Sequence, residues 1–176
     1  VFYDGETSSR PPHEPEQPIE LTAETAHGRM LKVYTRMPHN EPMQTIFGQY
    51  LRALAERDGA SLVHCFAGKD RTGIAAALLH HILGVSRADM LEEFLRTNDA
   101  PTYDILERQS LPGIEARLGG PLDRDAVAEL MQVREPYYQR FMETVGEGWG
   151  SLDSFLDRAI GVDDTLREQL QARFVA

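Results

Sequence analysis

The stretch Ser61-Leu62-Val63-His64-Cys65-Phe66-Ala67-Gly68-Lys69-Asp70-Arg71-Thr72-Gly73 decides the fold of this chain, and the Ala/Leu-rich run 74–83 follows it directly. Its short apolar beginning predicts a buried strand, and the run after Arg71 predicts a helix because no breaker occurs before Gly84. A tight loop joins the two. Backbone N–H groups of such a loop, with those that open the helix, converge on an anion. The stretch therefore predicts an anion site between a strand and a helix.

Two side chains of this loop, Cys65 and Arg71, are separated by five residues. The positive field of the N–H groups lowers the pKa of a thiol at the base of the loop, so we expect Cys65 to be a thiolate and a nucleophile. Arg71 can fold its planar guanidinium over the loop and bind two phosphoryl oxygens. Both groups would stabilise the transition state of an in-line attack on phosphorus.

The neighbours of these two residues suit the same chemistry. Thr72 offers a hydroxyl close to the sulfur, which would stabilise the thiolate when water cleaves a phosphocysteine. His64 is expected to orient the loop rather than to transfer protons. Phosphate would be bound by Phe66, Ala67, Gly68, Lys69, Asp70 and Arg71, with Gly73 supporting the turn.

The motif His-Cys-x-x-Gly-Lys-Asp-Arg-Thr-Gly resembles the signature of cysteine-dependent phosphatases. Its Lys69-Asp70 pair is similar to that of atypical bacterial tyrosine phosphatases that also act on phosphoinositides, and the resemblance extends from about Pro42 to the C-terminus. It implies an α/β cysteine-phosphatase-like fold and hydrolysis of phosphotyrosine in proteins through a phosphocysteine. Phosphoinositide headgroups or phosphoserine/threonine are further substrates to consider, and inorganic phosphate is expected to bind in the loop.

Other interpretations stay open at several positions. Asp70 is either the general acid or a carboxylate that orients Lys69 or Arg71, and Asp4 is a weaker candidate for the acid. Lys69 either enlarges the cationic pocket or is simply solvated. A Walker loop is excluded because Asp70 follows the lysine and Val63 stands where the first glycine belongs. A phosphate-binding module without catalysis is the alternative function.

Composition limits the remaining possibilities. The length of 176 residues predicts one domain over residues 1–176, which the resemblance implies is a phosphatase domain. The net charge of −10 argues against nucleic acid as a partner and against anionic membranes. No apolar run approaches the length of a membrane span, and no metal or organic cofactor is implied. We find no signal peptide and expect a cytoplasmic protein, with secretion left open because the sequence begins at Val1 and not at Met.

Apolar periodicity predicts helices in most of the chain, and only the segment before Cys65 is a convincing strand. We also expect Val1-Phe2-Tyr3 to be a strand fragment and residues 7–18 to be a mobile loop. One strand cannot form a sheet, so the sequence predicts a largely helical fold that lacks N-terminal strands. The helices are expected at 22–37, 42–57, 74–83, 86–95, 102–112, 123–133, 135–145, 151–160 and 163–174, with a further turn at 114–118. Tyr34 is one of the periodic apolar residues of the first, and Ser86 and Asp163 are expected to cap two others. Asn98 is interpreted either as support for the loop through hydrogen bonds or as part of a plain helix end.

Overall fold

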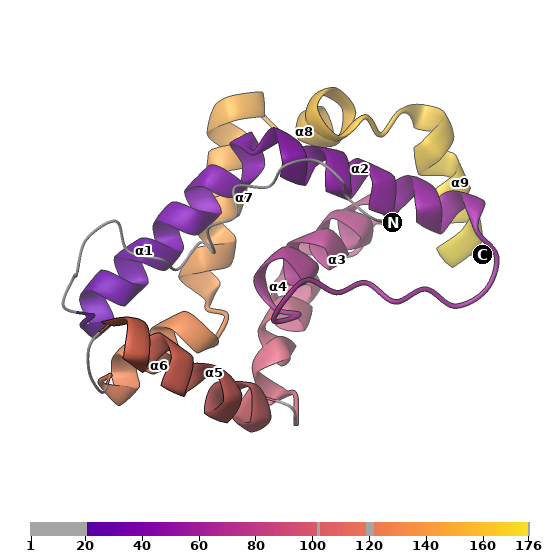
Figure 1. The fold of residues 1–176 in the computed structure, drawn as a ribbon. Coiled ribbons are helices and arrows are strands. Elements are labelled where there is room, and N and C mark those ends of the chain that lie inside the picture. The colour runs from indigo at the N-terminus through magenta and orange to yellow at the C-terminus, as the bar shows by residue number, and fades with distance from the viewer. Residues whose placement is uncertain (1–20, 102, 119–121, 176) are drawn as a thin grey trace.

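The structure is a computed structural model, which describes residues 21–101, 103–118 and 122–175. This part of the chain is built from α-helices joined by short 3₁₀ or π turns and irregular segments (Figure 1). The α-helices are α1 (Ala23–Arg36), α2 (Glu41–Glu56), α3 (Asp70–Ile82), α4 (Arg87–Leu95), α5 (Tyr103–Leu118), α6 (Arg124–Met131), α7 (Glu135–Trp149), α8 (Leu152–Phe155) and α9 (Asp164–Phe174). Apart from α5, the expected helices are therefore confirmed, with small differences at their ends.

Local sequence determines where several of these helices begin. Ser86 and Asp163, both expected as caps, accept hydrogen bonds from the backbone N–H groups of Asp89 and Leu166 at the first turns of α4 and α9. Thr22 caps α1 through a reciprocal pair of bonds with Thr25. These side chains satisfy N–H groups that have no partner within the helix, so their effect is local and readable from sequence.

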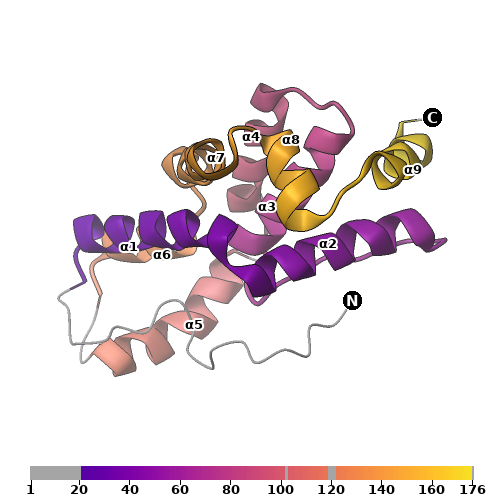
Figure 2. The ribbon, with the colours of Figure 1, turned by 90° about the horizontal axis from the view of Figure 1, so that it is seen from above.

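A core of aromatic and aliphatic side chains holds the helices together. Helix α1 lies along α6 and packs against α7, while α3 packs against α4, and α2 packs against α9 (Figure 2). Tyr34 of α1 is fully buried among aromatic rings of other helices: its ring stacks on Tyr137 of α7 and meets the edge of Phe94 of α4. This tyrosine joins the α1–α6–α7 group to α3 and α4.

The segment before Cys65 is not the buried strand that the sequence predicts. Residues 57–65 form no strand and lead from α2 back to α3 as a drawn-out segment (Figure 1). Leu62 is 88% exposed and Val63 is 37% exposed. The described residues contain no strand that could pair with this segment, so no backbone ladder within them satisfies its N–H and C=O groups. The largely helical fold is confirmed, while the α/β character does not appear within the described ranges.

Helix α5 also differs from expectation. We predicted a stop near Pro112-Gly113, but α5 runs through Pro112 to Leu118. A proline inside a helix removes one backbone hydrogen bond. None of the described side chains of α5 is fully buried, so water can satisfy the freed carbonyl. The strand fragment at residues 1–3, the candidate acid Asp4 and the loop 7–18 lie outside the described residues.

Candidate phosphate-binding site

The candidate site lies where the drawn-out segment meets the N-terminus of α3. Lys69 is the cap residue of α3, and Asp70, Arg71 and Thr72 form its first turn, as the sequence predicts for Arg71. Gly68 has a φ of +72°, a left-handed conformation that glycine adopts without strain. This bend turns the chain from the loop into the helix, so the N–H groups at the start of α3 are directed toward Cys65.

The thiol of Cys65 lies in a field that favours its ionised form. Burial alone would raise its pKa, but the Thr72 hydroxyl, the Arg71 charge and the backbone N–H groups of Gly68 and Thr72 together lower the pKa below the usual value for a thiol. The Thr72 hydroxyl is buried and has no conventional hydrogen-bond partner within the described ranges, so the sulfur is the group that it influences. The sulfur and the Arg71 guanidinium therefore lie within electrostatic reach of each other.

Arg71 has no carboxylate partner among the residues that the structure describes. Asp70, its neighbour in sequence, is instead paired with Lys69. A guanidinium that is not committed to a carboxylate keeps its planar set of donors for another anion. Arg71 is thus available for an oxyanion placed beside the sulfur.

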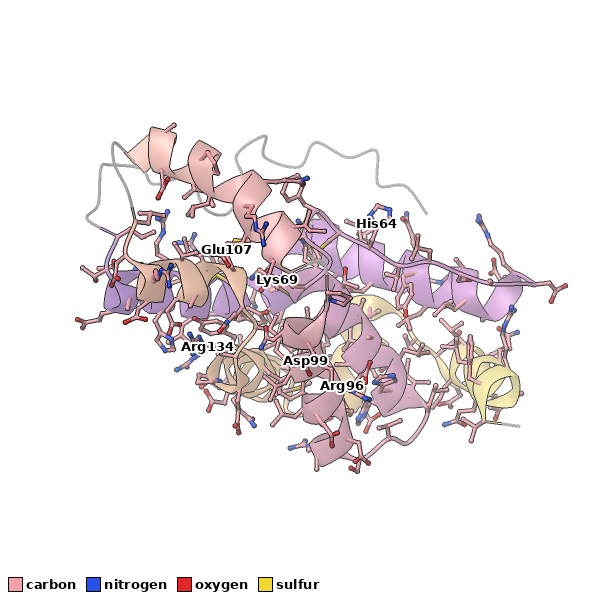
Figure 3. All side chains as sticks on the ribbon, turned by 90° about the horizontal axis from the view of Figure 1, so that it is seen from below. His64, Lys69, Arg96, Asp99, Glu107 and Arg134 are labelled. Atoms are coloured by element: carbon pink, nitrogen blue, oxygen red, sulfur yellow. The ribbon has the colours of Figure 1, made fainter. Side chains whose placement is uncertain are left out.

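Lys69 and Asp70 form a close ion pair at the beginning of α3. Lys69 is only 5% exposed, and its Nζ lies 2.9 Å from Asp70 Oδ1 and 2.8 Å from Asp70 Oδ2. Figure 3 places Lys69 inside the molecule and His64 farther out along the segment. Because Lys69 is buried and paired, it is not the solvated lysine that we had left open. A buried ammonium needs such a partner to offset the loss of its hydration.

The remaining loop residues divide between exposed and packed positions. The side chain of Phe66 is 89% exposed, and His64 is exposed with its Nδ1 donating to the backbone carbonyl of Cys65 at 3.0 Å. Gly73 lies against Phe94 so closely that an added Cβ would be 2.7 Å from Phe94 Cδ2. The helix side of the motif is therefore tightly packed, and the segment side is open.

The sequence did not predict the contact between Tyr34 and Asp70. The Tyr34 hydroxyl donates to Asp70 Oδ1 at 2.7 Å, although 36 residues separate the two. Periodicity identified Tyr34 only as one apolar member of a helix face, because a pattern within α1 carries no information about a partner on α3. By contrast Asn98, which we considered as support for the loop, is bound elsewhere: its amide bonds to both backbone groups of Val133 at 2.9 Å.

The fold also contains a surface hollow of about 330 Å³. It is lined by His80, Val85 and four residues of the α4 region, toward the opposite end of α3 from Cys65. No residue of the loop 64–73 lines it. The reactive groups around Cys65 therefore do not belong to this hollow.

A thiol of lowered pKa, a guanidinium without a carboxylate partner in the described ranges and the N-terminus of a helix therefore meet at this loop, and these are groups that can bind an oxyanion. Comparison with known proteins agrees: the model of the tyrosine phosphatase family matches residues 6–176, so the chain belongs to that family.

Individual relatives give the same result. The chain is 35% identical over 148 residues to a protein of Cupriavidus necator that is named as a tyrosine-protein phosphatase; the match covers 84% of this chain and 50% of that protein. It is 31% identical over 141 residues to a tyrosine-protein phosphatase of Nostoc commune, covering 77% of this chain and 45% of the relative. A triple-specificity protein phosphatase of Mycobacterium tuberculosis is 31% identical over 111 residues, with coverages of 54% and 37%. The chain thus spans half or less of each relative.

Within the described residues, no helix is both long and apolar enough to cross a membrane.

Proposed function

We propose that this protein is a cysteine-dependent phosphatase that hydrolyses phosphotyrosine in proteins through a phosphocysteine intermediate. The observation that carries the proposal is the lowered pKa of Cys65 beside an Arg71 that has no carboxylate partner in the described part of the chain. A thiolate is the nucleophilic form of cysteine, and an uncommitted guanidinium matches two oxygens of a phosphoryl group. The tyrosine phosphatase names of the relatives support the choice of substrate.

The reaction proceeds in two displacements. The Cys65 thiolate attacks phosphorus and the bond to the leaving oxygen breaks, with the equatorial oxygens held by the loop N–H groups and Arg71. Water then attacks the phosphocysteine, and the thiolate leaves with the help of the Thr72 hydroxyl, releasing inorganic phosphate. His64 holds the loop through its bond to the Cys65 carbonyl.

The proposed role of Asp70 follows from its contacts. Both of its oxygens accept from Lys69, and one also accepts from Tyr34, which supports the orienting role that we left open. Donation of a proton to the leaving oxygen remains the alternative role. The two differ in an Asp70→Asn variant: loss of an acid slows phenyl phosphate far more than an ester with a nitrophenolate leaving group, while loss of orientation slows both equally.

The decisive experiment measures hydrolysis of phosphotyrosine peptides by the purified protein and by Cys65→Ser. We expect turnover by the wild type and a loss of roughly 10⁴-fold or more in the variant, with inorganic phosphate still bound. Phosphoinositide and phosphoserine/threonine substrates assayed in parallel define the specificity. Phosphate binding without any turnover by the wild type would instead identify a non-catalytic phosphate-binding module and overturn the proposal.

A further inference from the structure

The Lys69–Asp70 pair is held from outside the loop by one hydroxyl. Tyr34 Oη donates to Asp70 Oδ1 at 2.7 Å, the same oxygen that accepts from Lys69 Nζ at 2.9 Å. Asp70 is therefore fixed from two directions, by a charge on its own element and by a donor on α1. No contact within the loop itself supplies the second direction.

The ring that carries this hydroxyl has little freedom to move. Tyr34 is fully buried, its ring stacks on Tyr137 with centroids 5.6 Å apart and an interplanar angle of 25°, and the edge of Phe94 meets it at 6.3 Å and 85°. Phe94 in turn lies against Gly73 of α3. The stacked contact with Tyr137 and the T-shaped contact with Phe94 set the position of the hydroxyl relative to α3.

The hydroxyl also keeps its proton. Burial, then the Asp70 charge and the hydrogen bond to Asp70, raise the pKa of Tyr34 well above its usual value. Tyr34 is consequently the donor in its hydrogen bond to Asp70.

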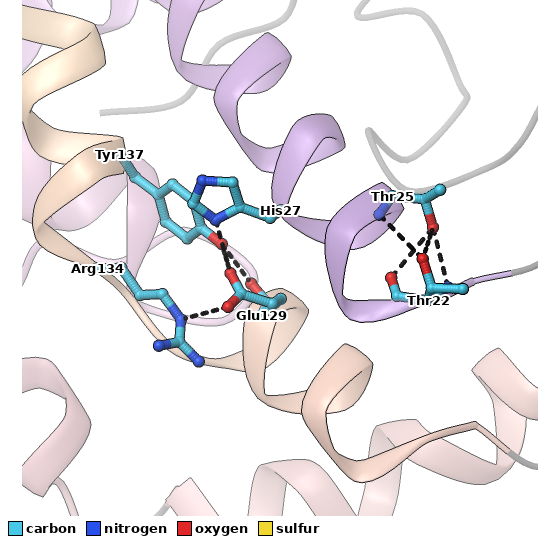
Figure 4. Close-up of polar contacts among 6 residues, drawn as sticks. All are labelled: Thr22, Thr25, His27, Glu129, Arg134 and Tyr137. Atoms are coloured by element: carbon cyan, nitrogen blue, oxygen red, sulfur yellow. Dashed lines mark hydrogen bonds and ion pairs between the residues drawn. The ribbon is translucent and has the colours of Figure 1, made fainter.

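A second cluster fixes the neighbouring ring of the stack. The Tyr137 hydroxyl donates to a Glu129 carboxylate oxygen, which also lies 2.9 Å from His27 Nδ1, while Arg134 Nε lies 3.2 Å from the other oxygen (Figure 4). The two stacked tyrosines thus donate to two different carboxylates, Asp70 at the loop and Glu129 away from it. This arrangement provides a matched pair of hydroxyls, one hydrogen-bonded to the loop and one to Glu129.

From these contacts we infer that Tyr34 is a positioning residue for phosphoryl transfer. It acts through Asp70 and holds Lys69 and the first turn of α3 in place relative to Cys65. The inference rests on the proposed function. Arg71 and the Thr72 N–H belong to the same turn as Asp70, so a shift of Asp70 displaces the groups that face the transferred phosphoryl oxygens. A displacement of about 1 Å at such groups is enough to slow catalysis.

The test compares Tyr34→Phe with Tyr137→Phe, since each removes one hydroxyl and keeps its ring in the stack. With para-nitrophenyl phosphate, Tyr34→Phe is expected to lower kcat about tenfold and to raise KM by a smaller factor, because a hydrogen bond to a charged group is lost and the turn that holds the phosphoryl oxygens is less well aligned. Tyr137→Phe is expected to keep kcat within twofold of the wild type, although it breaks a bond of similar strength. Equal losses in both variants would mean a general packing effect and would overturn the inference.

A double-mutant cycle shows whether Tyr34 acts through Asp70. In an Asp70→Asn background the neutral amide accepts more weakly, so Tyr34→Phe is expected to lower kcat less than threefold there. A full tenfold loss in that background would show that Tyr34 acts independently of Asp70, contrary to the inference.

Phosphate binding separates failure of the inference from failure of the proposed function. In the Cys65→Ser protein, calorimetric titration with inorganic phosphate is expected to show weaker binding after Tyr34→Phe but not after Tyr137→Phe. If the wild type hydrolyses no ester while this difference persists, the proposed function fails, and Tyr34 positions the turn for phosphate binding but not for phosphoryl transfer. If the wild type hydrolyses esters and Tyr34→Phe changes neither kcat nor phosphate binding, the positioning role fails alone.

Discussion

The two halves of one motif, residues 57–66 and residues 69–82, are organised in opposite ways. The second half begins with a buried ion pair, continues as α3 and packs against α4 and Tyr34. The first half forms no regular structure and leaves Leu62 and Phe66 almost fully exposed. The helix satisfies its own backbone through contacts four residues apart, whereas a strand needs a partner from elsewhere. A single motif can therefore be structured at one end by local sequence and remain open at the other.

The largest effect on activity is expected at Arg71, in the organised half. Arg71→Ala should lower kcat/KM for an aryl phosphate by about 10²–10³-fold, because it removes the donors that face the developing negative charge. Arg71→Lys serves as the control that keeps the charge but not the planar pair of donors, and we expect it to recover only a small part of the loss. Steady-state kinetics measure both. Full recovery by lysine would show that charge alone is used.

The next prediction compares the effect on stability of a leucine-to-alanine substitution in each of the two halves. Leu78→Ala, in the buried face of α3, should lower the free energy of unfolding by about 2–5 kcal/mol, whereas Leu62→Ala should change it by less than about 0.5 kcal/mol. Urea denaturation of the two variants measures the difference. A cost at Leu62 as large as that at Leu78 would mean that the segment is packed in solution, and the contrast between the halves would disappear.

The two glycines of the motif are needed for different reasons: Gly73 because a neighbouring ring leaves no room for a side chain, and Gly68 because its φ is positive. Gly73→Ala places a Cβ 2.7 Å from the buried ring of Phe94, and we expect it to destabilise the protein by about 1–3 kcal/mol. Gly68→Ala meets no atom within 4 Å but must adopt a φ of +72°, at a cost of about 1–2 kcal/mol. Thermal unfolding measures both. A second substitution, Phe94→Leu, should relieve the first defect and leave the second unchanged; relief of both would contradict this assignment.

The sequence predicted the parts of the molecule whose causes are local. Ser86 and Asp163 cap helices as expected, and Arg71 lies in the first turn of α3 because the run after it favours a helix. The prediction of a buried strand was wrong, since strand pairing depends on residues far away in the chain, which a local pattern does not show. Tyr34 was missed for the same reason: its partner Asp70 lies on another helix.

Within the site, the sequence predicted the direction of the Cys65 pKa shift better than it predicted the side-chain contacts. The lowered pKa that we expected for Cys65 is present, and its causes include the expected N–H groups and Arg71. The pairing of Asp70 with Lys69 was only one of two alternatives, because a carboxylate next to a lysine in sequence need not face it in space. Side-chain direction at a helix start depends on the neighbouring helix, which in this fold is α1.

The smallest expected effect concerns Cys65, which lies near the end of the open half, next to the organised half. Its pKa is below that of an ordinary thiol, so the rate of alkylation by iodoacetamide should stay near its maximum as the pH falls below about 8.5 and decline only through the lower pKa of the folded protein. The same shift makes a contribution to folding stability that is present above the unfolded pKa and is lost as the pH falls through the folded pKa, so the wild type should gain stability relative to Cys65→Ser as the pH rises across that interval.

Arg71→Leu should move the alkylation midpoint upward, because a positive charge near the sulfur is removed, whereas Arg167→Leu, whose guanidinium pairs with Asp153 outside the loop, should leave it in place. An unchanged midpoint in Arg71→Leu would mean that the helix N–H groups and Thr72 hold the thiolate without the guanidinium, and that the open half of the motif depends on the organised half through its backbone alone.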